Sequence, residues 1–436
     1  MESKRVHAQG KLFLWAAALT LSIAASTAAG DEAWWNPNRK HVAKLTDFGG
    51  VGDGVTSNTA AFAAAVANLS QVAGDGGAML VVPAGRWLTG PFNLTSTFTL
   101  FLERDAVILA TQNLDEWSTI APLPSYGRGR DLPGPRYTNF IMGYNLTDVV
   151  ITGNNGSING QGQVWWDKFR AEELNYTRGY LVEFMSCSYV VISNVVLVDS
   201  PSWNIHPVYS NYVAVVGVTV LAPIRSPNTD GINPDSCEYV WIANSNVVSG
   251  DDCIAIKSGW DQYGIAFNKP SQHIYISNFS CVSPTSATIA LGSEMSGGIA
   301  DVHAAGIVAV DTESALRVKT GIGRGGFVRD VNVEGMRLTN MKYLLWMTAN
   351  YGQHPDDKFD PNAIPVVNGI RFSNVAATNV SIAGKLEGLP QAPFTNISVV
   401  DVTAEIFVTK KPIWNCTFVE GSSYNVTPTP CAELQH

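Results

Sequence analysis

Short runs of alternating polar and apolar residues recur along the chain from about residue 140 onward, and each run ends near Asn or Gly. Four of them start at Ser188, Asn211, Glu238 and Gln272, at intervals of 23, 27 and 34 residues. Val, Ile and Tyr dominate these runs, and no apolar stripe of helical period competes with them, so the pattern predicts β-strands. An irregular repeat of this kind is typical of a solenoid whose turns accept loop insertions.

Later runs, which start at Phe327, Val367 and Phe394, continue the same repeat. Each repeat is too short for a βαβ unit, which needs about 30 residues or more including its helix. A β-sandwich, the alternative, would join its runs by tight hairpin turns, whereas here similar runs return with the spacing of a whole coil. We therefore predict an all-β fold, a right-handed parallel β-helix whose coils stack about 4.8 Å apart.

The segment before the repeats has a different pattern. An Ala-rich stretch runs through Leu69 and follows Ser57 and Asn58, both good N-cap residues, which predicts a short helix that caps the open end of the solenoid. Two stretches rich in Pro, Gly and charged residues, 121–137 and 350–365, are predicted to be loops. Because strand patterns resume directly after each of them, we predict a single domain over residues 31–436.

The first 30 residues have the pattern of a secretory signal peptide. Lys4, Arg5 and Lys11 precede an apolar run over residues 12–25, and small residues follow up to Gly30. The run is short for a membrane span, so an uncleaved anchor is the less favoured alternative. We predict a signal peptide over residues 1–30 and a secreted protein of the extracellular space or cell wall, without membrane association once the peptide is removed.

The cysteines and glycosylation sequons agree with export. Six cysteines, an even number, suit an oxidising compartment, and their irregular spacing without CxxC disfavours zinc. We predict disulfides between Cys253 and Cys281 and between Cys416 and Cys431, while Cys187 and Cys237 form a third bridge or remain buried thiols. The N-x-S/T sequons, which accept glycans in a eukaryotic cell, lie at Asn68, Asn93, Asn145, Asn155, Asn175, Asn278, Asn379, Asn396, Asn415 and Asn425.

The charge balance narrows the class of ligand. The chain has 436 residues and a formal net charge of -9, which argues against a nucleic acid or an anionic membrane as partner. A polyanionic ligand therefore needs a local group of basic residues.

Three acidic and two basic residues are predicted to meet on one outer face of the solenoid. Asp230 precedes Asp251 by 21 residues and Asp252 by 22, about one coil. Arg317 and Lys319 are two positions apart, so strand alternation points both side chains the same way. Hydrolysis of a glycosidic bond needs a proton donor for the leaving oxygen and a base for water, usually two carboxyl groups. Three clustered acids cannot all ionise freely, so at least one pKa should rise.

Four motifs in this order, "NTDGI", "GDDC", "GSEMSGG" and "RVKTG", resemble the polygalacturonase family of pectin-degrading glycosidases, glycoside hydrolase family 28. The "FGGVGDG" entry and the "NYGQHPDDKFDP" loop are similar to its plant members, and the resemblance extends from about Thr46 to about Pro365. It implies a right-handed β-helix that hydrolyses α-1,4-galacturonan without metal or cofactor and with inversion at the anomeric carbon. The implied partner is pectic polysaccharide, the protein being a monomer.

The resemblance also implies roles for individual residues. Asp251 is expected to be the general acid, while Asp230 and Asp252 position and deprotonate water. Arg317 and Lys319 are expected to bind the substrate carboxylate, and Tyr351, placed by a looser match, to contact the sugar near the scissile bond. Ordinary packing is an equal alternative for Tyr351.

One departure from the family leaves the activity open. Ala287 and Thr288 stand where the family commonly has a His-Gly pair, whose His supports protonation of the acid. Exo action is weakly favoured, because "IKSG" and "GSEMSGG" are similar to segments of exo-acting members. The alternatives are a hydrolase of rhamnogalacturonan or xylogalacturonan, a calcium-dependent lyase that uses the clustered acids as ligands, and a pectin-binding homologue with weak or no catalysis.

Overall fold

The computed structural model describes residues 38–407 and 412–435. The chain divides into two compact units, residues 1–36 and 37–436, and only the second contains described residues. The predicted signal peptide and its cleavage site therefore lie outside the described residues. Among the helices of the described part, none is long and apolar enough to cross a membrane.

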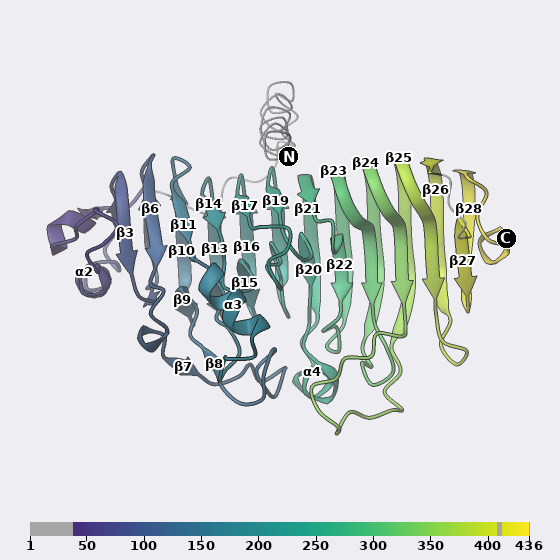
Figure 1. The fold of residues 1–436 in the computed structure, drawn as a ribbon, viewed down its shortest axis with the longest axis horizontal. Helices are drawn as coiled ribbons and strands as arrows, with labels where there is room; N and C mark the ends of the chain where they lie inside the picture. The colour runs from purple at the N-terminus through teal and green to yellow at the C-terminus, as the bar shows by residue number, and fades with distance from the viewer. Residues whose placement is uncertain (1–37, 408–411, 436) are drawn as a thin grey trace. The chain divides into compact units, whose positions relative to one another are not determined.

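The strands of the second unit stack as successive coils of a parallel β-helix (Figure 1). Ser188 of β13 (Ser188–Ser193) pairs with Asn211 of β16 (Asn211–Val216), which pairs with Glu238 of β18 (Glu238–Ala243). Glu238 in turn pairs with Gln272 of β21 (Ser271–Val282). The pairing register thus reproduces the intervals of the sequence repeat, because each repeat is one coil.

The coils become longer and more regular toward the C-terminus. There, β23 (Ile299–Lys319), β24 (Phe327–Thr348) and β25 (Val366–Glu387) each bend around a corner of the solenoid without interruption (Figure 1). They are followed by β26 (Phe394–Ile406), β27 (Trp414–Thr417) and β28 (Val419–Thr427). The other strands paired in parallel are β1 (His41–Lys44), β2 (Ala78–Val82), β3 (Gly85–Thr89), β4 (Phe92–Asn93), β5 (Phe98–Leu102), β6 (Ala106–Ala110), β9 (Ile141–Tyr144), β10 (Thr147–Gly153), β11 (Ser157–Asn159), β12 (Val182–Met185), β14 (Val196–Val198), β15 (Ile205–Val208), β17 (Thr219–Leu221), β19 (Asn246–Val248), β20 (Ile254–Ile256) and β22 (Ala287–Gly292).

The core is a set of aliphatic columns inside the coils. Strand alternation turns every second residue inward, and equivalent inward positions of successive coils lie directly over one another. One column is formed by Val190, Val213, Val240, Ile274, Val302, Val331, Ile370 and Ile397, all at most 2% exposed. Full burial of one such side chain stabilises the fold by about 1.5–3 kcal/mol.

A helix covers the N-terminal end of the solenoid, as predicted. In α2 (Thr59–Ser70), the inward face presents Phe62, Ala65 and Leu69 to the first coils, and all three are buried. Asn58 is the N-cap residue, yet its side chain makes no capping hydrogen bond to the helix. Its amide nitrogen donates to the carbonyl oxygens of Val51 and Leu88 instead, so it ties the entry loop to the first coil.

Two long loops and two short helices lie along one side of the coil stack, the lower side in Figure 1. The predicted loop 121–137 contains only β8 (Arg136–Tyr137), which pairs antiparallel with β7 (Thr119–Ile120). The predicted loop 350–365 contacts it, because Arg128 Nη1 donates to the carbonyl of Pro355 at 2.8 Å. The helices are α3 (Gln163–Arg170) and α4 (Asp261–Phe267), whose Tyr263 hydroxyl donates to Asp356 at 2.7 Å.

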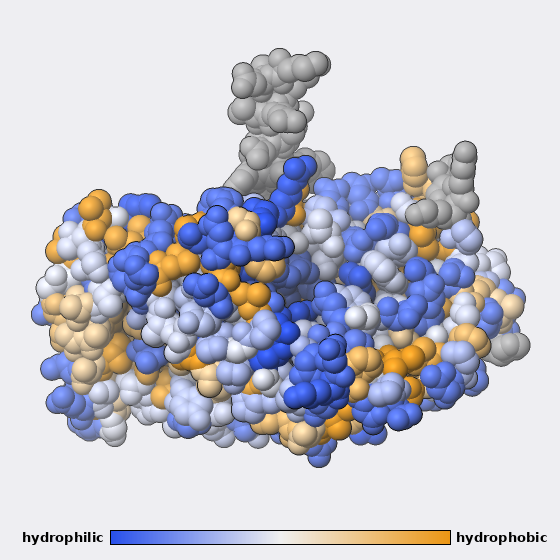
Figure 2. Space-filling model, turned by 60° about the horizontal axis from the view of Figure 1, so that its bottom comes forward, coloured by the Kyte–Doolittle hydropathy of each residue, from blue (hydrophilic) through white to orange (hydrophobic). Residues whose placement is uncertain are grey.

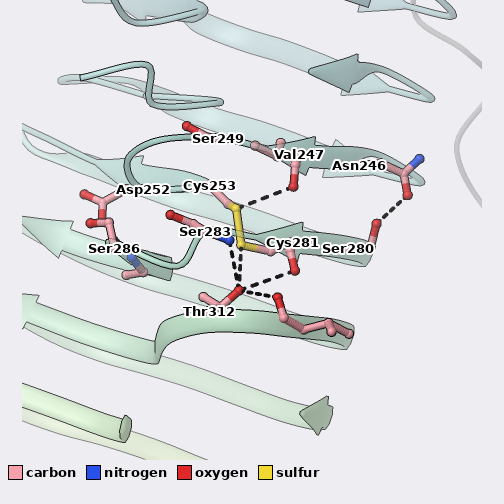
Figure 3. Close-up of a disulfide and its surroundings, with 12 residues drawn as sticks. Asn246, Val247, Ser249, Asp252, Cys253, Ser280, Cys281, Ser283, Ser286 and Thr312 are labelled. Atoms are coloured by element: carbon pink, nitrogen blue, oxygen red, sulfur yellow. Dashed lines mark hydrogen bonds between the residues drawn. A yellow bond between two sulfur atoms is a disulfide. The ribbon is translucent and has the colours of Figure 1, made fainter. Parts of the chain in front are cut away.

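Both predicted disulfides are present. Cys253 is bonded to Cys281, one coil farther on, and Cys416 is bonded to Cys431. Cys187 and Cys237 are buried free thiols, so the second of the two alternatives holds for them. The Cys253–Cys281 bridge lies inside the coils, directly behind the segment that carries the paired aspartates (Figure 3).

Candidate active site

The winding of the chain brings Asp230 next to the paired aspartates. Ile232 and Ile254 form a parallel bridge, and the backbone N–H of Gly231 donates to the carbonyl of Asp252 at 2.9 Å. The 22-residue interval between Asp230 and Asp252 is therefore one coil, as the spacing predicts.

The three aspartates line one cleft with a volume of about 300 Å³. Figure 2 shows hydrophilic side chains gathered around the hollow in the middle of this face. Of the other predicted site residues, Lys319 and Tyr351 also line the cleft, whereas Arg317 is absent from the described residues that form its wall. The geometry thus assembles five of the six predicted side chains.

A tight turn between two strands positions Asp251 and Asp252. β19 ends at Val248 and β20 begins at Ile254, and Gly250 lies in the turn between them, close to the backbone of Ser226. A Cβ at Gly250 would lie 2.2 Å from the carbonyl oxygen of Ser226, so no other residue fits there without displacing backbone. Behind the turn, the disulfide of Cys253 fixes it to the next coil.

Asp252 is held as a carboxylate by donors on both of its oxygens. Oδ1 accepts from the Ser286 hydroxyl at 2.5 Å and from the Ala287 N–H at 3.0 Å, and Oδ2 accepts from Lys319 Nζ at 2.5 Å. The side chain points outward from the coil, away from the disulfide (Figure 3). Burial alone would raise its pKa, but the charge and hydrogen bonds of Lys319 and the bond from Ser286 hold the pKa of Asp252 below its ordinary value.

Asp230 has the opposite electrostatic environment. Its side chain is 3% exposed. Burial, followed by repulsion from the charge of Asp251, raises the pKa of Asp230 to about 8, although Lys257 opposes the shift from 3.6 Å. Asn233 Nδ2 donates to Asp230 Oδ2 at 3.1 Å. The predicted rise of one pKa in the cluster therefore occurs at Asp230, which keeps a proton near neutral pH.

Asp251 is the half-buried member of the three. Its Oδ1 accepts the backbone N–H of Asp252 at 2.9 Å, and its Oδ2 accepts from Asn228 Nδ2 at 3.3 Å. Asn228 is fixed in turn by the fully buried Arg178, which donates to its Oδ1 at 2.7 Å. Asp251 is thus oriented by neutral donors, without an ion pair among the described residues, and its remaining surface faces the cleft.

The two predicted cations have different surroundings. Lys319 is 6% exposed and bound to Asp252, and the charge of that partner, against the cost of burial, raises the pKa of the lysine. Arg317 instead places its guanidinium 3.7 Å from the ring centre of Trp346 and pairs with Glu313 at 3.3 Å. Contact of Arg317 with substrate stays a prediction.

Sequence reasoning missed a second charged cluster in the cleft. Lys257 Nζ contacts Glu294 Oε2 at 3.0 Å and lies 4.4 Å from the ring centre of Trp203. Arg130 Nε contacts Glu294 Oε1 at 2.7 Å, so the buried carboxylate joins two cations. Lys257 and Glu294 belong to "IKSG" and "GSEMSGG", whose sequence pattern does not indicate that the two side chains meet, and the loop around Arg130 has no periodic pattern.

Ala287, at the position of the family's usual His, is buried beside Asp252. It packs with Ala255 and Ala290 in a small cluster of fully buried alanines. Its backbone N–H donates to Asp252, as described above, so this residue supports the Asp252 carboxylate through its main chain and supplies no titratable group.

The described acids do not form an open metal site. In the described ranges, one group of three potential ligands lies close enough to hold a metal ion: Cys416, Cys431 and Glu433. Its two cysteines form a disulfide and offer no thiolate. In the cleft, both oxygens of Asp252 are occupied by protein donors, which disfavours a Ca²⁺ site that needs six to eight free oxygen ligands.

Comparison with known proteins places the chain in a family. The model of the glycosyl hydrolases family 28 matches residues 80–427. The chain belongs to this family. A probable polygalacturonase from Vitis vinifera is 57% identical over 397 residues, which are 91% of this chain and 81% of that protein.

Two solved polygalacturonase structures agree with the fold. A hyperthermoactive exopolygalacturonase from Thermotoga maritima superposes with a TM-score of 0.77 at 27% identity, covering 91% of this chain and 93% of that chain. A polygalacturonase from Erwinia carotovora gives a TM-score of 0.65 at 20% identity over 91% and 100% of the two chains. The predicted right-handed parallel β-helix is thereby confirmed.

Proposed function

We propose that this family 28 glycosidase is a pectin-degrading polygalacturonase that cleaves α-1,4-galacturonan by a single displacement with inversion. The carrying observation is the cleft in which Asp230, Asp251 and Asp252 meet, because inverting hydrolysis requires one protonated and one ionised carboxyl group flanking the bond. The plant relative that is 57% identical, a probable polygalacturonase, supports the substrate class.

The electrostatics support a division of labour among the three acids. Asp252, bound by Lys319, remains ionised and is suited to orient and deprotonate water. The three carboxyl groups share a proton. At neutral pH it resides mainly on Asp230, whose pKa is raised, and Asp251, which faces the cleft, donates it to the leaving oxygen in the protonation state in which Asp251 carries it. Protonated Asp230 can position water by hydrogen bonding, while Asp252 serves as the base. Carboxyl groups that share protons in this way titrate together. The acidic and basic limbs of the pH–activity profile therefore report pKa values of the whole cluster, not of single residues.

Exo action is the favoured mode. The loops 121–137 and 350–365 both contribute to the cleft wall, and Arg130 Nη2 joins them by donating to Gln353 Oε1 at 3.0 Å. These two joined loops close the cleft at the end where Arg130 lies, so a polysaccharide cannot pass through at this point. The end of a galacturonan chain can enter the cleft, whereas the middle of a chain cannot. The similarity to the exopolygalacturonase at 27% identity supports the same reading.

The test is incubation with polygalacturonate followed by chromatography of the products. Release of monomer from the first time point supports exo hydrolysis, and a ladder of oligomers supports endo hydrolysis. An unsaturated product that absorbs in the ultraviolet would instead identify a lyase. Binding of pectin without any product, unchanged in Asp251→Asn, would replace the hydrolase by a binding protein that kept the fold.

We also propose that the protein is secreted to the cell wall as a monomeric glycoprotein after removal of residues 1–30. All ten sequon asparagines are exposed in the structure, which is the placement that glycan attachment requires. N-terminal sequencing of protein collected from the medium checks the cleavage, and a mass decrease on enzymatic deglycosylation checks the glycans. An intact residue 1 or an unchanged mass would refute the corresponding part.

A further inference from the structure

One cation in the cleft is held rigidly and still has unused donors. Arg130 enters from the loop 121–137, and its side chain is 24% exposed. Its Nε is bound to Glu294, its Nη2 donates to Gln353, and its guanidinium lies 4.5 Å from the ring centre of Trp260. Among the described residues no partner accepts from Nη1. A guanidinium carries five N–H donors, so at least the two on Nη1 are available to a ligand in the cleft.

The loop that carries Arg130 is anchored independently of any ligand. The neighbouring Asp131 accepts from Nε of the fully buried Arg178 at 3.0 Å, and its backbone N–H donates to the Thr177 hydroxyl at 3.0 Å. Arg178 also orients Asn228, which donates to Asp251. The position of Arg130 is therefore coupled through one buried arginine to the position of the proton donor. A preorganised donor binds its ligand without an additional ordering cost.

The other cations of the cleft are already neutralised by protein groups. Lys319 is bound to Asp252, and Lys257 is 4% exposed between Glu294 and Asp230. Arg130 shares Glu294 with Lys257, so one carboxylate lies between two cations and the guanidinium of Arg130 keeps N–H groups that no described protein carboxylate accepts. A planar guanidinium with free N–H groups matches a carboxylate in geometry and charge.

We propose that Arg130 is a specificity-determining residue that binds the carboxylate of the terminal uronate at the closed end of the cleft. The proposal rests on the proposed function, since it assumes that a galacturonan chain end enters there. Arg130 would then select substrates by their terminal carboxyl group. A free carboxylate is bound, whereas a methyl ester or a neutral hexose leaves the Nη1 donors without an anionic partner.

The experiment compares trigalacturonates that differ at a single terminal carboxyl group. This carboxyl is free, methyl-esterified or reduced to the primary alcohol, at either end of the trimer, and kcat/KM is measured for each. Wild-type protein is expected to prefer the free acid at one end by about tenfold or more, the range of a charge-assisted hydrogen bond. In Arg130→Gln that ratio falls to within about twofold, and Arg130→Lys, which keeps the charge and loses the fork, lies between.

Arg128→Gln is the matched control, because Arg128 is two residues away in the same loop and binds Pro355 outside the cleft wall. It is expected to keep the wild-type ratio. A loop that merely loses order lowers kcat/KM for acid and ester alike, whereas loss of recognition changes their ratio. An unchanged ratio in Arg130→Gln, at any absolute rate, overturns the proposal; if that variant does not fold, an unchanged ratio in Arg130→Lys does so.

A binding measurement separates this proposal from the proposed hydrolysis. In the Asp251→Asn background, calorimetry compares galacturonate with galactose, and the preference for galacturonate should disappear on Arg130→Gln. If wild-type protein hydrolyses none of the trimers but this binding preference depends on Arg130, hydrolysis is refuted and the carboxylate site stands. If the trimers are hydrolysed and neither the kinetic ratio nor the binding preference responds to Arg130, the carboxylate site is refuted alone.

Discussion

On the inside of the coils, aliphatic side chains from Val190 to Ile397 repeat in one column, while on the cleft side Asp230, Asp252 and Lys319 line one cleft and affect one another's ionisation. Each inward residue packs against a similar residue above and below, so its contribution depends little on any particular partner. Each cleft residue is stable in its ionisation state only because of specific neighbours. A substitution in the interior should therefore change stability through local packing alone. A substitution on the cleft face should change the ionisation of several neighbouring residues at once.

The largest effect is expected at Asp251, the proposed proton donor. Asp251→Asn removes the donated proton and keeps the shape of the side chain, so kcat on polygalacturonate should fall by about 10²–10⁴-fold, the usual range for a general acid. The thermal midpoint should remain close to wild type, because the asparagine can still accept from the Asp252 N–H. Reducing-end assays and calorimetry on the same preparation check both parts. Wild-type kcat in this variant would remove Asp251 from the mechanism.

The next effect is expected from Lys319→Met, which leaves Asp252 as a buried carboxylate without its ion pair. Such a loss destabilises by about 3–5 kcal/mol at neutral pH. In the wild type the lowered pKa of Asp252 contributes stability above pH 3.8, which is lost as the pH falls through its folded-state value. In the variant burial dominates and the folded-state pKa rises, so stability should increase toward acid pH. Urea denaturation at pH 4 and pH 7 measures the sign of this difference, and equal losses at both pH values would contradict it.

On the interior face, Ile370→Ala should reduce the free energy of unfolding by about 2–5 kcal/mol, through lost burial and the cavity left behind. Its neighbour Arg371 is exposed, and Arg371→Ala is the control, with an expected change within about 0.5 kcal/mol. Neither loss should depend on pH between 4 and 8, in contrast to the cleft variants. A strong pH dependence of the Ile370→Ala loss would break the distinction between the two faces.

The smallest change should be a gain. Burial and Asp251 raise the pKa of Asp230 to about 8, so folding retains a proton that the unfolded chain releases above pH 3.8, and stability declines as the pH rises between these values. Asp230→Asn abolishes this decline but also removes the carboxyl partner of Lys257, so the net gain at pH 8 should be about 1 kcal/mol, well below the several kcal/mol that the full pKa shift would give at about 1.4 kcal/mol per unit. The gain should vanish near pH 4. Stability curves of both proteins over this range decide it, and destabilisation at pH 8 would contradict the raised pKa.

The same contrast explains what the sequence could and could not predict. Alternation and repeat length were sufficient for the coils and for the meeting of Asp230 with Asp252, because stacked strands convert sequence intervals into distances, while the Ala-rich stretch after Asn58 was sufficient for the capping helix. The loop 121–137 has no period, so nothing indicated that Arg130 enters the cleft or that it shares Glu294 with Lys257. Strand alternation paired Arg317 with Lys319, but the stacking of Arg317 on Trp346 depends on the next coil. Likewise, the sequence predicted that one carboxyl group of the cluster has a raised pKa. Assigning the raised pKa to Asp230 required knowing how deeply each side chain is buried.

The most direct test of the coupled acid cluster is a carbon-13 NMR titration of the Asp230 carboxyl in wild-type protein and in Asp251→Asn. The wild-type carboxyl should titrate near pH 8, and removal of the neighbouring charge at position 251 should lower its pKa. An Asp230 carboxyl that titrates near pH 3.8 in both proteins would mean that the three acids do not act on one another, and the proposed sharing of roles among them would be wrong.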